Sequence, residues 1–121
     1  MYKYHNANKY KHSINDCTIR AISVATDSTW DETYEELSTE ARHMGLMMDS
    51  VEFIEQYLDD RYERTCHYSK TVDEFIKEFP QGIYLISMLG HLSCVIDGVN
   101  IDTFDTRNRR MWCAWRVDTH W

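Results

Sequence analysis

Three residues of this chain have the types and spacing needed to activate a thiol for nucleophilic attack. The first is Cys17, which follows Asn15 and Asp16, and both of these are residue types that cap helices. The thiol is therefore predicted to lie in the first turn of a helix, where the helix dipole and unpaired N–H groups favour the nucleophilic thiolate. An inert, buried cysteine at a helix start is the alternative interpretation.

The other two residues are His91 and Asp102, on either side of a predicted hairpin. Asp97-Gly98 is typical of a two-residue hairpin turn. With that turn, Ser93 pairs with Asp102, and Asp102 lies diagonal to His91 on the same face. A carboxylate there holds one imidazole nitrogen and leaves the other to accept a thiol proton. A four-residue loop keeps this alignment, whereas a three-residue loop breaks it.

The chain before Gly82 is predicted to be mainly helical. The segment that starts at Cys17 is apolar on nearly every side, which indicates a central helix, and Arg20 is expected to form a structural ion pair with Asp16 or another nearby acid. Capping residues predict the starts of three more helices: Thr29 with Glu32, Ser50, and Thr71 with Glu74. The side chains expected to face the core from the second and third helices are Trp30, Tyr34, Leu37, Ala41, Met44, Val51, Ile54, Tyr57 and Leu58.

The chain after Gly82 is predicted to be a β-sheet. Strands are expected at residues 83–89, 91–96, 100–104 and 112–117, and a short strand around Cys66 is an open alternative. Residues 1–15 are polar and are expected to form an irregular arm. Helices followed by an antiparallel sheet indicate the α+β class.

Composition places the chain among compact domains. It has 121 residues, of which 43% are hydrophobic and 27% charged, and this composition excludes a disordered or low-complexity protein. We therefore expect one domain over residues 1–121. No apolar run approaches the roughly 18 residues that span a bilayer, and residues 1–15 contain no hydrophobic signal segment. The sequence predicts a cytoplasmic protein that does not associate with membranes.

Charge argues against nucleic acid as a partner. The net charge is −7, and because the first fifteen residues carry three lysines and no acid, the remainder carries −10. Such a domain repels phosphate backbones at long range. We therefore expect a protein or peptide partner and no nucleic acid.

The four cysteines, Cys17, Cys66, Cys94 and Cys113, are separated by 49, 28 and 19 residues. This spacing contains no C-x-x-C pair of the kind that binds zinc. A chain of this length buries an adequate core without disulfides, so free thiols in a reducing compartment are expected. No motif for a nucleotide, flavin or haem is visible, and we expect no metal and no cofactor.

Several segments of the chain share an ordered set of motifs with a known superfamily. The motifs lie in NDCTIRAISVATDSTWDETYEEL, in TVDEFIKEFPQGIYLISMLGHLSCVIDGVNIDTFD, and in the tryptophan-containing end. Their order is D-C-x-x-R-A-I, a G-x-Y strand, a G-H step, and D-G before D-T-F-D. In these features the chain resembles small papain-like proteins of the cysteine peptidase superfamily, which phages and bacteria often encode. More distantly, it is similar to bacteriocin-processing and cell-wall-type cysteine peptidases.

The resemblance covers nearly the whole chain and implies a papain-like fold. It implies that Cys17 is the nucleophile, His91 the base and Asp102 the acid that orients the histidine. Papain-like enzymes commonly carry a Gln before the nucleophile as an oxyanion donor, and no Gln precedes Cys17. The nearby donors are Asn6, Asn8, His12 and Asn15, and Asn15 is the one we predict.

Two functions follow as expectations. The first is a thiol hydrolase that cleaves an amide or peptide bond through Cys17, His91 and Asp102. The second is a non-catalytic protein of phage type that uses a papain-like scaffold to bind and inhibit a host protein, since a fold does not determine a function. Enhanced reactivity of Cys17 that depends on His91 distinguishes the first from the second. The sequence does not indicate an oligomeric state.

Overall fold

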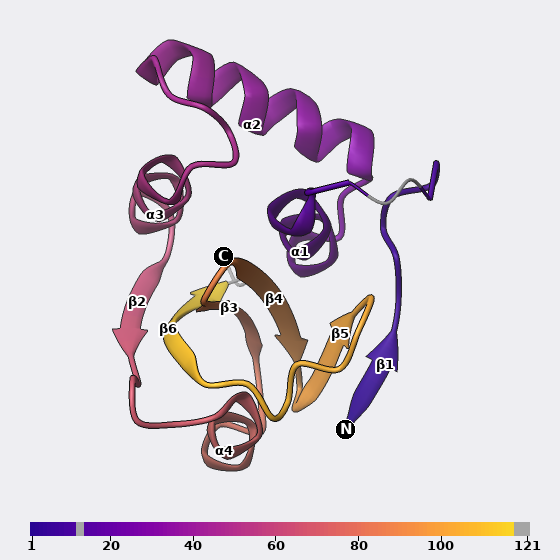
Figure 1. The fold of residues 1–121 in the computed structure, drawn as a ribbon, viewed down its shortest axis with the longest axis vertical. Coiled ribbons are helices and arrows are strands. Elements are labelled where there is room, and N and C mark those ends of the chain that lie inside the picture. The colour runs from indigo at the N-terminus through magenta and orange to yellow at the C-terminus, as the bar shows by residue number, and fades with distance from the viewer. Residues whose placement is uncertain (12–13, 118–121) are drawn as a thin grey trace.

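The computed structural model describes residues 1–11 and 14–117, and it has the α+β architecture. Within these residues it contains four helices: α1 (Cys17–Thr26), α2 (Trp30–Met44), α3 (Val51–Asp59) and α4 (Val72–Glu78). It also contains six strands: β1 (Tyr2–Tyr4), β2 (Glu63–Cys66), β3 (Ile83–Met88), β4 (His91–Ile96), β5 (Val99–Asp102) and β6 (Met111–Val117). The helices α1 to α3 lie on one side of the sheet and α4 lies at the opposite end of the molecule (Figure 1).

The strands form one sheet in the order β1-β5-β4-β3-β6-β2. Each of its two faces buries a separate core. On one face α1, α2 and α3 cover Leu85, Leu92 and Trp115, and on the other α4 covers Ile86 and Met111. The alternation of side chains along β3 and β6 supplies both cores, which is why these central strands are almost wholly apolar.

The capping residues start the helices where the sequence predicts. Thr29 with Glu32 and Thr71 with Glu74 both form complete capping boxes, and the side chain of Ser50 accepts the backbone N–H of Phe53. Two of the side chains expected in the core are not there, because Tyr34 and Val51 are exposed. Both border a cleft between the helices and the sheet, so their helices turn these positions toward an open space.

The expectation of an irregular arm and an antiparallel sheet is wrong at the N-terminus. Residues Tyr2–Tyr4 form β1, which pairs with β5 in the parallel direction and makes the sheet mixed. The pairing brings Tyr4 beside Asp102, and the backbone oxygen of Asp102 accepts hydrogen bonds from the His5 N–H at 2.9 Å and the Tyr2 hydroxyl at 3.1 Å. The arm therefore holds the backbone of a predicted site residue.

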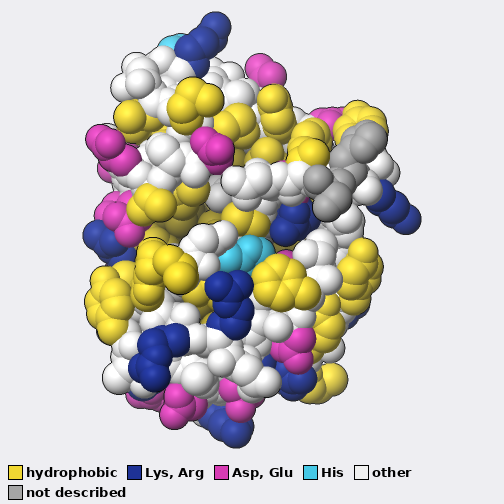
Figure 2. Space-filling view, in the orientation of Figure 1, with side chains coloured by type: hydrophobic (Ala, Val, Ile, Leu, Met, Phe, Trp, Pro, Cys, Tyr) yellow, Lys and Arg dark blue, Asp and Glu magenta, His cyan; other side chains and the backbone are white. Residues whose placement is uncertain are grey.

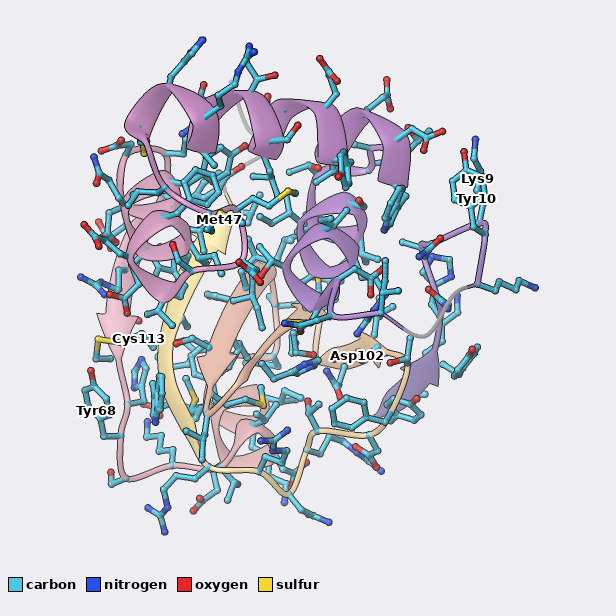
Figure 3. All side chains as sticks on the ribbon, turned by 45° about the horizontal axis from the view of Figure 1, so that its top comes forward. Lys9, Tyr10, Met47, Tyr68, Asp102 and Cys113 are labelled. Atoms are coloured by element: carbon cyan, nitrogen blue, oxygen red, sulfur yellow. A yellow bond between two sulfur atoms is a disulfide. The ribbon has the colours of Figure 1, made fainter. Side chains whose placement is uncertain are left out.

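The free-thiol expectation is wrong for Cys66 and Cys113, which form a disulfide between β2 and β6. The two residues face each other directly in the antiparallel register of these strands. Cys17 and Cys94 are the remaining free cysteines, and Cys94 is fully buried. Figure 3 shows the disulfide at Cys113, with Tyr68 next to it. The edge strand β2 is thus covalently joined to its neighbour β6.

The β4–β5 hairpin has the predicted two-residue turn. Asp97 and Gly98 both have positive φ angles, 48° and 78°, and Ile96 pairs with Val99 across the turn. Counting back along this register places Ser93 opposite Asp102. The strand ends at Asp102 and not at Phe104, because the Thr103 N–H donates to the Asp102 carboxylate at 2.7 Å and leaves the ladder.

Substituting Gly98 with alanine is expected to lower the free energy of unfolding by about 1 kcal/mol, because an alanine is strained at φ 78°. Thermal or chemical unfolding of Gly98→Ala beside wild type measures this loss. The control is Asp97→Asn, which tolerates a positive φ and keeps the side-chain oxygen that accepts the Gly82 N–H, so its stability should stay within about 0.5 kcal/mol of wild type. Equal stability of Gly98→Ala and wild type would contradict the turn geometry.

Candidate functional site

A cleft of about 480 Å³ opens between the N-terminus of α1, the α2–α3 connection and the turn between β3 and β4. Cys17, His91 and Asn15 all line it. In the space-filling view a histidine lies in this hollow, with hydrophobic side chains around it (Figure 2). The volume falls in the range of about 300–1,000 Å³ that is usual for sites that bind small molecules or short segments. The cleft therefore contains the predicted nucleophile and base in one accessible space.

Cys17 is the first residue of α1, and its side chain lines the cleft together with His91, close enough for the imidazole to act on the pKa of the thiol. Burial raises the pKa of the Cys17 thiol, but the hydrogen bond with His91, a hydrogen bond from the Leu92 backbone N–H and the charge of His91 lower it, and the net shift is downward. The imidazole and the backbone of β4 thus favour the thiolate of Cys17.

His91 joins Cys17 to Asp102. Its Nε2 lies 2.7 Å from Asp102 Oδ2, so the N–H there donates to the carboxylate and Nδ1 is left for the thiol. The ring of Phe104 packs against the imidazole at a centroid distance of 4.8 Å. The carboxylate and the aromatic ring together fix the orientation of the histidine.

The pKa shifts of Cys17, His91 and Asp102 each favour the charged form of the group. Burial lowers the pKa of His91, but hydrogen bonds to Asp102 and Cys17 outweigh it and raise the pKa to about 9. Burial raises the pKa of Asp102, whereas hydrogen bonds from His91 and Ser93 lower it to a net value below the ordinary one. These directions favour a thiolate at Cys17 beside an imidazolium at His91, which is hydrogen-bonded to the Asp102 carboxylate.

A buried polar network behind Asp102 was not predicted from the sequence. The Ser93 hydroxyl donates to Asp102 Oδ2 at 2.6 Å, and the Asn100 amide donates to Ser93 at 2.9 Å and to the Cys94 carbonyl at 3.2 Å. The Asn100 carbonyl oxygen accepts both the N–H and the hydroxyl of Thr106. All three side chains, Ser93, Asn100 and Thr106, are fully buried and hydrogen-bonded within this network. The network therefore holds the Asp102 carboxylate in one position. The signal in the sequence was two polar residues, Ser93 and Asn100, at predicted strand positions, whereas Thr106 lies in the loop after β5.

Replacing Ser93 with alanine is expected to lower the pKa of His91 and to slow labelling of Cys17 severalfold at pH 6, because Asp102 loses one of the donors that hold it. NMR titration of the imidazole and alkylation kinetics measure the two effects. Ser23→Ala is a matched control, since Ser23 is a buried serine bonded to Ile19 and Thr33 and lies outside the network. An unchanged His91 titration in Ser93→Ala would contradict the role given to Ser93.

Asp16 fixes the residues that lead into Cys17. It occupies the N-cap position, yet its side chain makes no capping hydrogen bond. Its buried carboxylate pairs with Arg20 and accepts hydrogen bonds from Asn8 Nδ2 at 3.1 Å and Trp30 Nε1 at 3.0 Å. The predicted Arg20–Asp16 ion pair is confirmed. Because the side chain faces these partners, it does not cover the N–H groups of the first turn of α1.

The structure places three of the four candidate oxyanion donors, and their positions differ. Asn15 is exposed and lines the cleft, whereas Asn8 is buried and bonded to Asp16 and to the Tyr10 N–H. The side-chain oxygen of Asn6 accepts the Asn8 N–H, and His12 lies outside the described residues. Of the described candidates, only Asn15 lines the cleft that contains Cys17.

Two further observations bear on ligands. In the described part of the chain, no group of three or more histidine, cysteine or acidic side chains is arranged to hold a metal ion. Over the same residues, no helix combines the length and the hydropathy needed to cross a membrane.

Comparison with known proteins does not assign this chain to a family. No protein-family model, no curated protein and no solved structure matches it. The case for a function therefore depends on the geometry of the cleft.

Proposed function

We propose that this protein is a papain-like thiol hydrolase that cleaves an amide or peptide bond. The observation that carries the proposal is that Cys17, at the start of α1, and His91 line one cleft, and that His91 is held by Asp102 at 2.7 Å. A cysteine at a helix start, followed in the chain by a histidine and an acid on adjacent strands, also agrees with the resemblance described above.

The chemistry begins with the Cys17 thiolate and the His91 imidazolium. The sulfur attacks the substrate carbonyl carbon, and the negative charge moves to the carbonyl oxygen. When the C–N bond breaks, His91 gives its proton to the leaving amine, and a thioester with Cys17 remains. Water then attacks the thioester while His91 accepts its proton, and the C–S bond breaks to release the acid and restore Cys17.

The oxyanion formed in both steps needs donors. The Cys17 N–H is one of the first N–H groups of α1, which have no partner within the helix, and Asn15 is the neighbouring side chain that lines the cleft. These two groups are the proposed oxyanion donors. Asp102 keeps His91 in the tautomer and orientation that the proton transfers require.

Incubation with an activated p-nitrophenyl ester tests the proposal. We expect a burst of nitrophenol, an acyl adduct on Cys17 in the intact mass, and slow release of the acid; Cys17→Ser should abolish the adduct. Asn15→Ala is expected to slow acylation by about 10²–10³-fold while leaving alkylation by iodoacetamide unchanged, because alkylation forms no oxyanion. Absence of any adduct on a reactive Cys17 would contradict hydrolase activity.

A second candidate is the non-catalytic binding protein. The observation that favours it is the border of exposed apolar side chains around the cleft, which a binding protein also uses. Such a protein would bind its partner equally well as wild type and as Cys17→Ala, and Cys17 would alkylate like an ordinary thiol.

A further inference from the structure

Large apolar side chains border the cleft and remain exposed to solvent. The exposed fraction is 72% for both Met47 and Leu89, and Ile14, Tyr34 and Val51 are also exposed. All five line the cleft, although they come from separate parts of the fold. Figure 3 shows Met47 on the connection after α2, on the helical side of the cleft. Exposed apolar side chains that gather around one hollow mark a surface that binds another molecule.

The same cleft is acidic. Asp49 and Glu55 line it, and within the described residues its lining contains no lysine or arginine. Arg64 partly neutralises Glu55 at 3.5 Å, whereas Asp49 is exposed and forms no ion pair with another described residue. The net charge of −7 adds to the local negative potential. On the helical side, where Asp49 lies, the cleft therefore favours a cationic group over an anionic one, whereas Arg109 borders the opposite side and donates to the Leu89 carbonyl at 2.9 Å.

We propose that the occupant of the cleft is an extended peptide segment that presents an apolar side chain next to Cys17 and a lysine or arginine side chain to Asp49. The apolar border accounts for the first part and the unpaired carboxylate for the second. A lipid chain would gain nothing from Asp49, and anionic headgroups would be repelled. This inference rests on the proposed hydrolase, because it names the substrate class of that site.

Peptidyl chloromethyl ketones that alkylate Cys17 test the inference. Each peptide carries leucine beside a second residue, which is lysine, norleucine or glutamate, and each pair is made in both orders. A matching peptide has asparagine in place of leucine. The second-order rate of Cys17 labelling is followed by intact mass. In the order of residues that labels faster, we expect the lysine peptide to label Cys17 about 5-fold faster than the glutamate peptide. This is the effect of gaining one exposed ion pair and avoiding one repulsion. Norleucine should fall between them, and asparagine in place of leucine should slow labelling about 10-fold.

Two variants isolate the part played by Asp49. Asp49→Lys should remove or invert the preference for lysine over glutamate. Glu52→Lys makes the same change in net charge at an exposed position of α3 that does not line the cleft, and it should keep the preference. Equal loss of the preference in both variants would assign it to the overall charge and overturn the role of Asp49.

The outcomes separate this inference from the hydrolase proposal. If Cys17 reacts rapidly with iodoacetamide but all peptides label it equally, or a fatty-acyl chloromethyl ketone labels it fastest, the substrate class is overturned and the hydrolase stands. If Cys17 reacts as an ordinary thiol, the hydrolase fails. Fluorescence anisotropy of the non-reactive peptides on Cys17→Ser then still decides the inference: tighter binding of the lysine peptide supports it, and equal binding overturns it.

Discussion

Replacing His91 with alanine is expected to slow the alkylation of Cys17 by iodoacetamide at pH 6 by on the order of 100-fold. In the wild type, His91 helps to keep the pKa of Cys17 below its ordinary value, so a larger fraction of Cys17 is thiolate at a given pH than in an ordinary cysteine. Without the imidazole, Cys17 keeps the Leu92 N–H, the Thr18 side chain and the start of α1, and its pKa moves back toward the ordinary thiol value of about 8.5.

The pH dependence of hydrolysis follows from the same pair. The rate should rise with pH as Cys17 loses its proton, below the ordinary thiol range, and should fall again near pH 9, where His91 loses the proton that the leaving amine needs. The ion pair is complete only between these two limits. The alkylation rate of the wild type should reach its plateau at the lower limit, since alkylation needs the thiolate and not the imidazolium.

Intact-mass kinetics between pH 5 and 9 measure these profiles. Labelling should stop at one adduct, because Cys94 is fully buried and burial raises the pKa of its thiol. His67→Ala is the matched control, as His67 packs on Phe75 and Phe79 away from the cleft and its loss should leave the profile unchanged. A His91→Ala variant that labels as fast as wild type at pH 6 would show that His91 does not activate Cys17.

Reduction of the Cys66–Cys113 disulfide is expected to lower the free energy of unfolding by about 4 kcal/mol. The two cysteines are 47 residues apart in the chain, and the bond removes the entropy of that loop from the unfolded state. For a domain of this size, the melting temperature should fall by roughly 10–20 °C. The loss of stability should also affect the cleft, because β6 carries Trp112 and Trp115, which line the cleft.

Thermal unfolding with and without a reductant measures the effect. The double variant Cys66→Ala/Cys113→Ala should melt near the temperature of the reduced wild type and should not respond to reductant. Alkylation of the denatured, unreduced protein provides the direct count: two adducts agree with the disulfide, and four would show that it does not form. Assays of Cys17 should therefore use the weakest reductant that keeps this thiol free.

The features that depend on neighbouring residues were predictable. Capping boxes and the Asp97-Gly98 turn are set within a few residues, and the turn alone determines the register that brings Asp102 to His91. Cys17 could be assigned to a helix start for the same reason. Its partnership with His91 was inferred from a resemblance and an order of residues, because it depends on how α1 packs against β4; the structure places both residues in the lining of one cleft.

The features that depend on distant segments were not predictable. The disulfide requires β2 and β6 to pair in one register, and nothing near Cys66 specifies that register. Asn100 looks like any polar residue in a strand until Ser93 and Thr106 lie on either side of it. The apolar border of the cleft was also missed, because Tyr34 and Val51 have the helical spacing of core residues and only the packed fold shows that no element covers them.

The parallel pairing of β1 with β5 has a consequence for how the protein is made. Tyr2 is synthesised well before Asn100, its partner far along the chain, so β1 cannot join the sheet until β5 has been made, whereas the β4–β5 hairpin closes across a two-residue turn. Cys17 likewise precedes His91 and Asp102 in the chain. A nascent chain without β4 and β5 therefore lacks the groups that lower the pKa of this thiol, and the lowered pKa depends on the completed β4–β5 hairpin.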